Sequence, residues 1–238
     1  MKQLNQFIIE YIVKKKLNKP IYSEDHYIYF PETKSELIEI IKNLLNDNQT
    51  DLNIIDVSKI TDMSELFDKI NQKIEISNID ISKWDVSNVT NMRYMFFDCR
   101  EFDCDLSSWN VSNVENMTGM FINCVNLNSD FSSWNISNVK YISNMFNWCK
   151  KFEGKGLENW NVSNVENMAF MFKDCSIFDC DLSNWDVSKV TNMRYMFDNC
   201  SNFKGEGLEN WNTNKVKDMH NMFEKCISLK NKPNWYKE

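Results

Sequence analysis

The chain has 238 residues, of which 42% are hydrophobic and 26% charged, and its formal net charge is −7. This composition is typical of a folded, soluble protein and argues against disorder and membrane-spanning segments. The negative charge removes the attraction to phosphate on which sequence-independent nucleic-acid binding depends, so we expect no nucleic-acid partner. The only histidines are His26 and His220, which offers little for a histidine metal site or for Ser-His-Asp catalysis.

Residues 1–17 are expected to form a helix. Glu10 interrupts the apolar stretch, three lysines follow it and no small-residue cleavage site is present, so the segment does not resemble a secretory signal. Packing on the protein's own domain is favoured over a membrane-surface helix. We therefore expect no membrane span and a cytoplasmic or assembly-associated location. The apolar residues recur at helical spacing: Leu4, Phe7, Ile8, Tyr11 and Ile12.

A second helix is predicted from Thr33 to Asn46. Thr33 and Glu36 have the spacing of a capping box. The short apolar run from Tyr27 to Phe30 is ended by Pro31 and is compatible with one strand. Residues 1–50 are therefore predicted to form an N-terminal cap of two helices and a short strand. The second helix has one apolar stripe: Leu37, Ile40, Ile41, Leu44 and Leu45.

From residue 81 onward the chain repeats itself. Tryptophans from Trp84 to Trp235 follow one another at 25, 25, 26, 25, 26 and 24 residues. We assign six repeats to residues 81–232, a degenerate first repeat to 51–80 and a C-terminal cap to 233–238. Cysteines keep the same period: Cys99, Cys124, Cys149, Cys175, Cys200 and Cys226.

Each repeat combines two periodicities. Leu106, Trp109 and Val111 are spaced as the inward residues of a short extended segment. Neither part can bury its apolar side alone, so neighbouring repeats must stack. We predict an α/β solenoid, a leucine-rich-repeat-like curved array with one short parallel strand and one short helix in each repeat of 25–26 residues, the strands lying inside the curve. The second periodicity of each repeat is the +3 and +4 spacing of one helix face, as in this repeat: Val114, Met117, Phe121 and Cys124.

Glycines occur mainly in the two repeats of 26 residues. The motifs E-G-K-G and K-G-E-G hold four of the five glycines. We predict bulges there that absorb the extra residue. These glycines are Gly154, Gly156, Gly205 and Gly207.

The periodic cysteines are predicted to be a ladder of buried thiols. On successive helices their Cα atoms would lie about 8–10 Å apart, beyond the roughly 7 Å that a disulfide allows. Cys104 and Cys180 stand five residues after a ladder cysteine, so local Cys99–Cys104 and Cys175–Cys180 disulfides remain an alternative. We expect no metal and no cofactor, because no second Cys/His pair has ligand spacing. Since no catalytic motif is present either, we do not expect an enzyme.

The motif L-x-x-W-[DN]-V-S-N-V-x-N-M-x-x-M-F-x-x-C resembles the repeat of the BspA-like leucine-rich-repeat surface proteins, including the mycoplasma lipoprotein-type repeats of about 25 residues. The resemblance covers about residues 52–235. It implies a leucine-rich-repeat-type fold and a binding function, often adhesion or host contact. It also implies surface exposure, although the chain shows neither an export signal nor a lipid-attachment cysteine near its start.

Two surfaces are candidates for partner binding. The strand face would present small, polar, mildly acidic residues such as Ser107, Ser108 and Asn110. The helix face carries large apolar residues at positions that stacking does not require, which suggests an interaction patch. Packing between neighbouring helices is the alternative explanation. The predicted partner-binding residues are Tyr94, Phe97, Ile122, Trp148, Phe170 and Tyr195.

The leading functional hypothesis is a non-enzymatic protein–protein interaction or scaffold module with a protein partner. The alternative is an adhesin-like surface or virion-associated protein that mediates host or cell contact. An enzyme would be considered only if Cys104 or Cys180 were unusually reactive.

Overall fold

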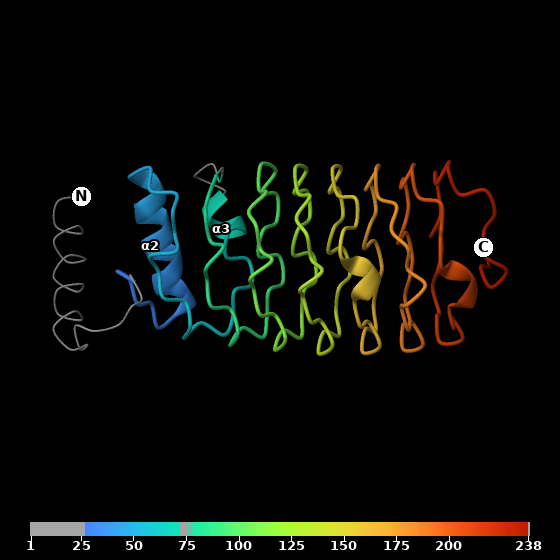
Figure 1. The fold of residues 1–238 in the computed structure, drawn as a ribbon, viewed down its shortest axis with the longest axis horizontal. Coiled ribbons are helices and arrows are strands. Elements are labelled where there is room, and N and C mark those ends of the chain that lie inside the picture. The colour runs from blue at the N-terminus through green and yellow to red at the C-terminus, as the bar shows by residue number, and fades with distance from the viewer. Residues whose placement is uncertain (1–26, 72–75, 77, 238) are drawn as a thin grey trace.

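The computed structural model describes residues 27–71, 76 and 78–237. Figure 1 shows the described residues as one coil after another stacked along a nearly straight axis, with helix α2 (Lys34–Asn46) toward one end and the C-terminal residues at the other. Isolated parallel bridges join equivalent positions of successive coils and set the register of the stack. Most of them form one continuous series: Asp62–Asn91, Asn91–Asn116, Asn116–Tyr141, Tyr141–Asn167, Asn167–Asn192 and Asn192–Asp218.

The helix predicted over residues 33–46 is confirmed as α2, Lys34–Asn46. The Thr33 hydroxyl accepts the Glu36 N–H at 3.2 Å, while the Glu36 carboxylate accepts the N–H of Glu32 at 2.7 Å. No helix in the described part of the chain is long and apolar enough to cross a membrane. The helix predicted over residues 1–17 lies outside the described residues. The side of α2 that faces the stack buries Leu37, Ile41, Leu44 and Leu45.

The short strand predicted at residues 27–30 is reduced to one bridge. Tyr29 pairs with Ile55, and the Asp56 N–H donates to the Tyr29 carbonyl at 2.9 Å. The Ile28 N–H donates to the Ile54 carbonyl at 2.8 Å. This segment therefore begins the same coil-to-coil pairing that continues through the repeats.

The predicted α/β solenoid is wrong. Over residues 27–71 and 78–237, no strand occurs, and the only α-helices are α2 and the one-turn α3, Asp68–Asn71. Two short 3₁₀ helices, η1 (Leu157–Asn159) and η2 (Leu208–Asn210), complete the regular structure. The predicted curvature also fails, because it assumed a layer of helices needing more room than a layer of strands.

A pair of turns replaces the predicted strand. The Trp109 N–H donates to the Leu106 carbonyl at 3.1 Å, which closes a turn where an extended segment was expected. The Asp105 carboxylate accepts the Ser107 N–H at 2.9 Å, an Asx-turn that competes with strand geometry. Asn110 opens the following turn in the same way. The D-x-S and N-V-S motifs are therefore turn signals.

The helix predicted over residues 114–124 does not form, and two further turns take its place at residues 117–124. Gly119 and Asn123 have φ of 61° and 59°, in the left-handed region that an α-helix does not accept. Alternate main-chain N–H groups donate to the next coil, as that of Phe121 does to the Met145 carbonyl at 2.9 Å, and those between them close turns by donating three residues back. Apolar residues still recur at +3 and +4 because each turn returns the chain to the interior after three residues.

Stacked aromatic rings form the interior of the rod. Consecutive phenylalanine rings lie 5.1–5.8 Å apart between centroids and nearly parallel. Each repeat tryptophan also donates its indole N–H to a carbonyl of the preceding coil, as Trp134 does to Leu106 at 3.0 Å. Both the burial of these rings and their hydrogen bonds therefore require a neighbouring coil. The phenylalanine column consists of Phe67, Phe96, Phe121, Phe146, Phe172, Phe197 and Phe223.

The predicted ladder of buried thiols is confirmed, although not for the predicted reason. The six periodic cysteines are buried, but no helices separate them. Instead, each thiol from Cys124 onward donates to a phenylalanine carbonyl of the preceding coil, as Cys149 does to Phe121 at 3.0 Å. All eight cysteines are free thiols in the structure.

The extra residue of the longer repeats is absorbed by η1 and η2, and not by the predicted bulges. Gly156 and Gly207 precede these 3₁₀ helices with φ of 89° and 84°. A Cβ on Gly156 would lie 2.2 Å from the main-chain nitrogen of Ser132 in the preceding coil. This position therefore requires glycine for both conformation and space.

We expect Gly156→Ala to lower the free energy of unfolding by about 3 kcal/mol, from backbone strain and the clash with the neighbouring coil. Urea denaturation followed by tryptophan fluorescence measures the change. Lys155→Ala, at an exposed position one residue earlier, is the control and should cost less than about 1 kcal/mol. Equal effects of the two substitutions would contradict this account of the turn.

Candidate functional site

All six residues predicted to bind a partner lie on one side of the rod. They belong to the equivalent segments 92–99, 117–124, 142–149, 168–175, 193–200 and 219–226, whose outward side chains we call the turn face. In each segment the first, fourth, fifth and last side chains point inward. The predicted residues occupy the third, sixth or seventh position, where the stack does not require an apolar side chain.

Tyr94, Phe97 and Ile122 form the first cluster on the turn face. The Tyr94 and Phe97 rings meet edge to face at 5.9 Å. A Cβ on Gly119 of the next coil would fall 2.1 Å from the Tyr94 ring, so that ring covers the glycine. The Arg93 guanidinium lies 4.7 Å from the Tyr94 ring centroid. Phe97 remains 38% exposed, so the cluster keeps an open apolar surface.

Phe170 and Tyr195 form the second cluster. Their rings stack at 5.1 Å with an interplanar angle of 7°. Arg194 lies over both rings, at 5.2 and 5.4 Å, and the Lys173 ammonium lies 5.3 Å from the Tyr195 ring. The His220 ring meets the Tyr195 ring edge to face, with the ring centroids 5.9 Å apart. Two cations and three rings are therefore gathered over three coils.

Trp148 lies on the coil between the two clusters and is 42% exposed. The Lys150 ammonium lies 5.0 Å from its ring. Tyr141, on the same coil, is also 42% exposed. The sequence analysis did not single out Tyr141. It could have done so, because the other five repeats carry four asparagines and one aspartate at this position.

The structure therefore divides the six predicted residues into two kinds. Four are half-buried, which is the packing role that the sequence left open: Tyr94, Ile122, Phe170 and Tyr195. Phe97 and Trp148 are exposed and have no such role. Tryptophan, tyrosine and arginine are the residues that most often dominate binding energy in protein interfaces.

The face predicted to be formed by strands consists of turns, and its polar groups tie the coils together. The Asn113 and Asn138 amides donate to the Ser87 and Ser112 carbonyls, both at 2.7 Å. The Ser133 hydroxyl donates to the carbonyl of Ser107 at 2.5 Å. Many of these groups are thus already used within the stack, which leaves fewer for a ligand.

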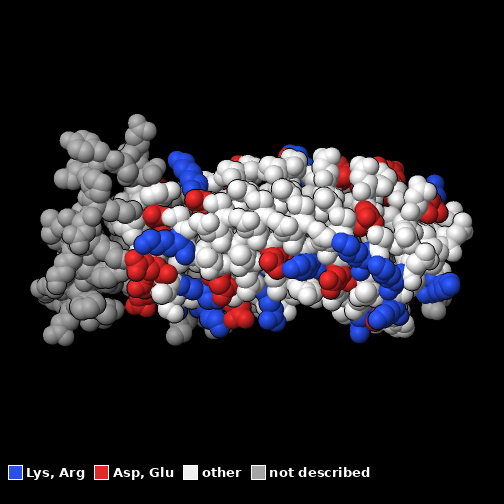
Figure 2. Space-filling model, turned by 90° about the horizontal axis from the view of Figure 1, so that it is seen from below, with Lys and Arg blue, Asp and Glu red and all other residues white. Residues whose placement is uncertain are grey.

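Several surface charges are paired between neighbouring coils. Figure 2 shows a broad band of uncharged side chains along the rod, with both signs of charge interspersed beside it. Lys140 pairs with Glu115 at 2.9 Å, and Lys155 pairs with Asp130 at 2.8 Å. The hydrogen bond from Lys155, with those from Ser132, lowers the pKa of Asp130 to about 2.

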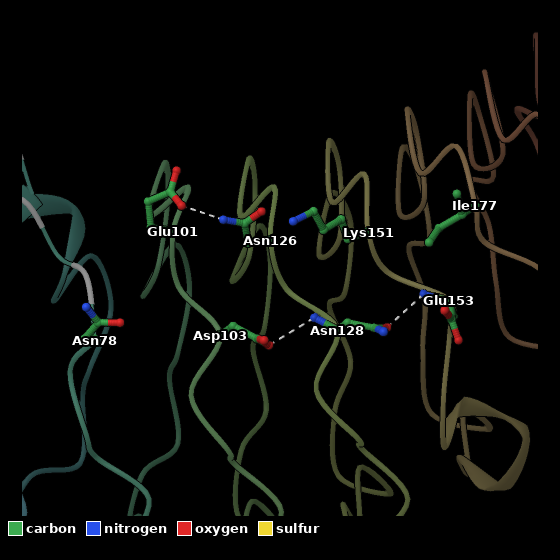
Figure 3. A pocket seen from close by; sticks show the side chains of 8 residues that line it. All are labelled: Asn78, Glu101, Asp103, Asn126, Asn128, Lys151, Glu153 and Ile177. Carbon is green, nitrogen blue, oxygen red and sulfur yellow. Dashed lines mark hydrogen bonds between the residues drawn. The ribbon is translucent and has the colours of Figure 1, made fainter.

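A groove of about 720 Å³ crosses several coils next to the turn that follows each ladder cysteine. Figure 3 shows its two rows of polar side chains. The Asn126 amide donates to Glu101 at 2.5 Å, and the Asn128 N–H donates to Asp103 at 3.2 Å. Such rows could hydrogen-bond a polar, extended ligand. The lining residues, none of which the sequence singled out, are Asn78, Glu101, Asp103, Asn126, Asn128, Lys151, Glu153 and Ile177.

The two cysteines outside the ladder do not have the environment of a nucleophile. Desolvation raises the pKa of Cys104, and it raises that of Cys180 to about 12 with help from the charge of Glu158. A reactive cysteine needs a lowered pKa, because the thiolate is the attacking species. Within the described ranges, no group of three His, Cys, Asp or Glu residues is placed to hold a metal ion.

We therefore expect the native protein to react slowly with a thiol reagent at pH 8. With a pKa of about 12, only about one Cys180 in 10,000 is ionised at that pH. The rate should increase as pH rises toward the raised pKa, and all eight thiols should react at once in denaturant. Mass spectrometry after timed labelling measures this, and rapid labelling of native Cys104 or Cys180 would contradict it.

One family model matches this chain, and its description reads "Mycoplasma protein of unknown function, DUF285". It matches twice, over residues 35–156 and 126–236. No curated protein and no solved structure matches the chain. The prediction of a mycoplasma-type repeat protein is confirmed at this level, whereas the closer likeness to BspA-like surface proteins stays a prediction. Because the two matches together cover α2 and the repeats, the chain belongs to the DUF285 family.

Proposed function

We propose that this chain is a non-enzymatic interaction or scaffold module that binds a protein partner through the turn face. The observation that supports this most directly is the exposure of Phe97 and Trp148, 38% and 42%, at positions that stacking does not use. In the same positions other repeats carry small or polar residues such as Asn123 and Asn147. The fold does not explain the large side chains, but a partner would.

The chemistry of the turn face suits a protein surface. Its tyrosine, tryptophan and phenylalanine rings lie under Arg93, Lys150 and Arg194. Aromatic rings supply apolar contact area, while the guanidinium and ammonium groups supply hydrogen-bond donors at the rim. From Tyr94 to Tyr195 the face crosses five coils, about 20 Å at the spacing of parallel-paired chains. That length is compatible with an interface of standard size.

The alternative proposal is an adhesin-like surface or virion-associated protein. It is favoured by the resemblance to BspA-like surface repeats and would use the same turn face. Protease shaving or surface labelling of intact cells or particles separates the two proposals. Labelled peptides of this chain would favour the surface role, and labelling only after lysis would favour the interaction module.

The double variant Phe97→Ser/Trp148→Ser tests the turn face. We expect at least about tenfold less partner captured by the immobilised variant, since exposed aromatic anchors dominate interface energies. The melting temperature should change by only about 2 °C, because both side chains are already partly solvated. Quantitative mass spectrometry of captured proteins and thermal denaturation are the two measurements.

Ile177→Ser is the matched control, because Ile177 is also 36% exposed but lines the groove. It should leave capture unchanged. If the double variant captured the same proteins in the same amounts while melting at a clearly lower temperature, the aromatic residues would be packing residues and the proposal would fail. If only Ile177→Ser lost the captured proteins, the partner would bind at the groove and not at the turn face.

A further inference from the structure

Two of the six repeats carry the same arginine–tyrosine pair on the turn face. The eight residues V-T-N-M-R-Y-M-F occur at 89–96 and again at 190–197. At the arginine position the other four repeats have threonine, serine, alanine and histidine, so the stack does not require a cation there. The two pairs, Arg93–Tyr94 and Arg194–Tyr195, lie four coils apart, which is about 20 Å at the spacing of parallel-paired chains.

Aromatic residues of the turn face stand where the backbone favours other residue types. Tyr94, Trp148 and Tyr195 have φ of 54°, 65° and 54°, in the left-handed region. Bulky residues rarely adopt this region, whereas asparagine and glycine adopt it more readily. At the tyrosine position other repeats have such residues, as at Gly119 and Asn144. The conformation of the coil therefore does not select these rings.

The cations of the turn face are held by rings and not by carboxylates. Arg93 and Lys150 lie 4.7 and 5.0 Å from the centroids of aromatic rings, and neither forms an ion pair with another residue that the structure describes. Arg194 Nε lies 3.9 Å from a carboxylate oxygen of Asp218, which is too far for a hydrogen bond. A guanidinium over a ring keeps its N–H donors available for a carboxylate.

The carboxylates of the same face are used within the stack. Asp98 pairs with Arg100 at 3.1 Å, and Asp198 pairs with the Lys173 ammonium. Asp174 accepts a hydrogen bond from a neighbouring asparagine amide at 2.7 Å. Over residues 92–200 the turn face therefore has cationic donors to spare, while its aspartates already have partners in the chain.

Most of the surface between the two arginines is uncharged. Of the three coils between them, two have no charged residue in their turn segments, 117–124 and 142–149. These coils carry Ile122 and Trp148, the second of which is 42% exposed. The charges of the third coil, Lys173 and Asp174, lie 3.7 Å from each other. Along the rod the turn face thus presents a cation, an apolar stretch and a second cation.

We propose that the turn face binds a segment of another protein that has acidic side chains at both ends and apolar side chains between them. The two end carboxylates lie about 20 Å apart and accept hydrogen bonds from Arg93 and Arg194. The apolar side chains cover Ile122 and Trp148. This inference rests on the function proposed above and deepens it, because it names the charge pattern of the partner.

A nucleic acid is a poorer occupant. Its phosphates recur at every nucleotide and would pass over Asp98 and Asp174 as well as the arginines. The chain as a whole has a net charge of −7, which opposes a polyanion. Carboxylates confined to the two ends of a protein segment meet both arginines without this repulsion.

Two synthetic polymers of equal length, titrated against the full chain, test the proposal. One is a random copolymer of glutamate and tyrosine, which presents carboxylates and rings at many different spacings, and the other is polyglutamate. The copolymer should bind at least about threefold more tightly, because only its rings can cover the apolar stretch. Its affinity should fall as salt is added. Fluorescence anisotropy of the labelled polymers measures both affinities.

Substitution of the arginines locates the binding. Arg93→Gln and Arg194→Gln should each weaken copolymer binding about threefold, and together about tenfold, since exposed ion pairs contribute modestly and distant sites add. The double variant Lys83→Gln/Lys215→Gln removes two charges from exposed lysines outside the turn face and should bind as the unaltered protein does. Melting temperatures within about 2 °C of one another establish that all variants are folded.

Three results would overturn the proposal: no binding of the copolymer, equal binding of polyglutamate, or equal affinity of the arginine and lysine double variants for the copolymer. Tighter binding of polyuridylate than of the copolymer would assign the face to nucleic acid instead. Protein capture separates this proposal from the function on which it rests. If Phe97→Ser/Trp148→Ser lost its captured proteins but Arg93→Gln/Arg194→Gln kept them, the turn face would bind a partner that needs no acidic ends.

Discussion

Hydrogen bonding from each coil to the next is the constraint on which the rest of this structure depends. Over residues 81–237 the structure has no α-helix that satisfies its own peptide groups and no strand that could form a regular sheet. Peptide N–H groups, indole N–H groups and thiols each find their acceptor one coil away, as at Phe121, Trp134 and Cys149. Because unpaired buried polar groups are costly, a coil is stable only between neighbours that continue the pattern.

The same constraint explains the composition of the repeat. Asparagine, aspartate and serine start the turns, as Asp105 does for Ser107, and other amides such as Asn113 link coils. Methionine, phenylalanine, tryptophan and cysteine fill the interior. The repeated residues therefore serve to form the turns, to link the coils and to fill the interior of the stack. Specific recognition is left to positions outside that framework.

The turn face is such a place. At Phe97 and Trp148 it offers exposed rings that the stack does not need. In the proposed role, these rings would contact a partner surface through their shape and apolar area.

Much of the arrangement was predictable from the residues alone. The 25- to 26-residue period, the inward tryptophans and phenylalanines, α2 and the buried thiol ladder all follow from spacing, because burial repeats wherever the motif repeats. The same spacing misled the assignment of local structure. Residues at +3 and +4 mark one face of a helix, but they also mark successive turns, and nothing in Tyr94 or Trp148 announces a left-handed φ of 54° or 65°.

For the candidate sites, the sequence by itself determined which large apolar side chains occupy positions that stacking does not require. It thereby identified the six predicted partner-binding residues on the turn face. Only the tertiary structure decided that four of them are partly covered by neighbouring coils while Phe97 and Trp148 stay exposed. It alone revealed the exposure of Tyr141 and the polar groove. The reason is physical: each depends on which groups of adjacent coils face one another, a relation between residues about 25 positions apart that local pattern does not encode.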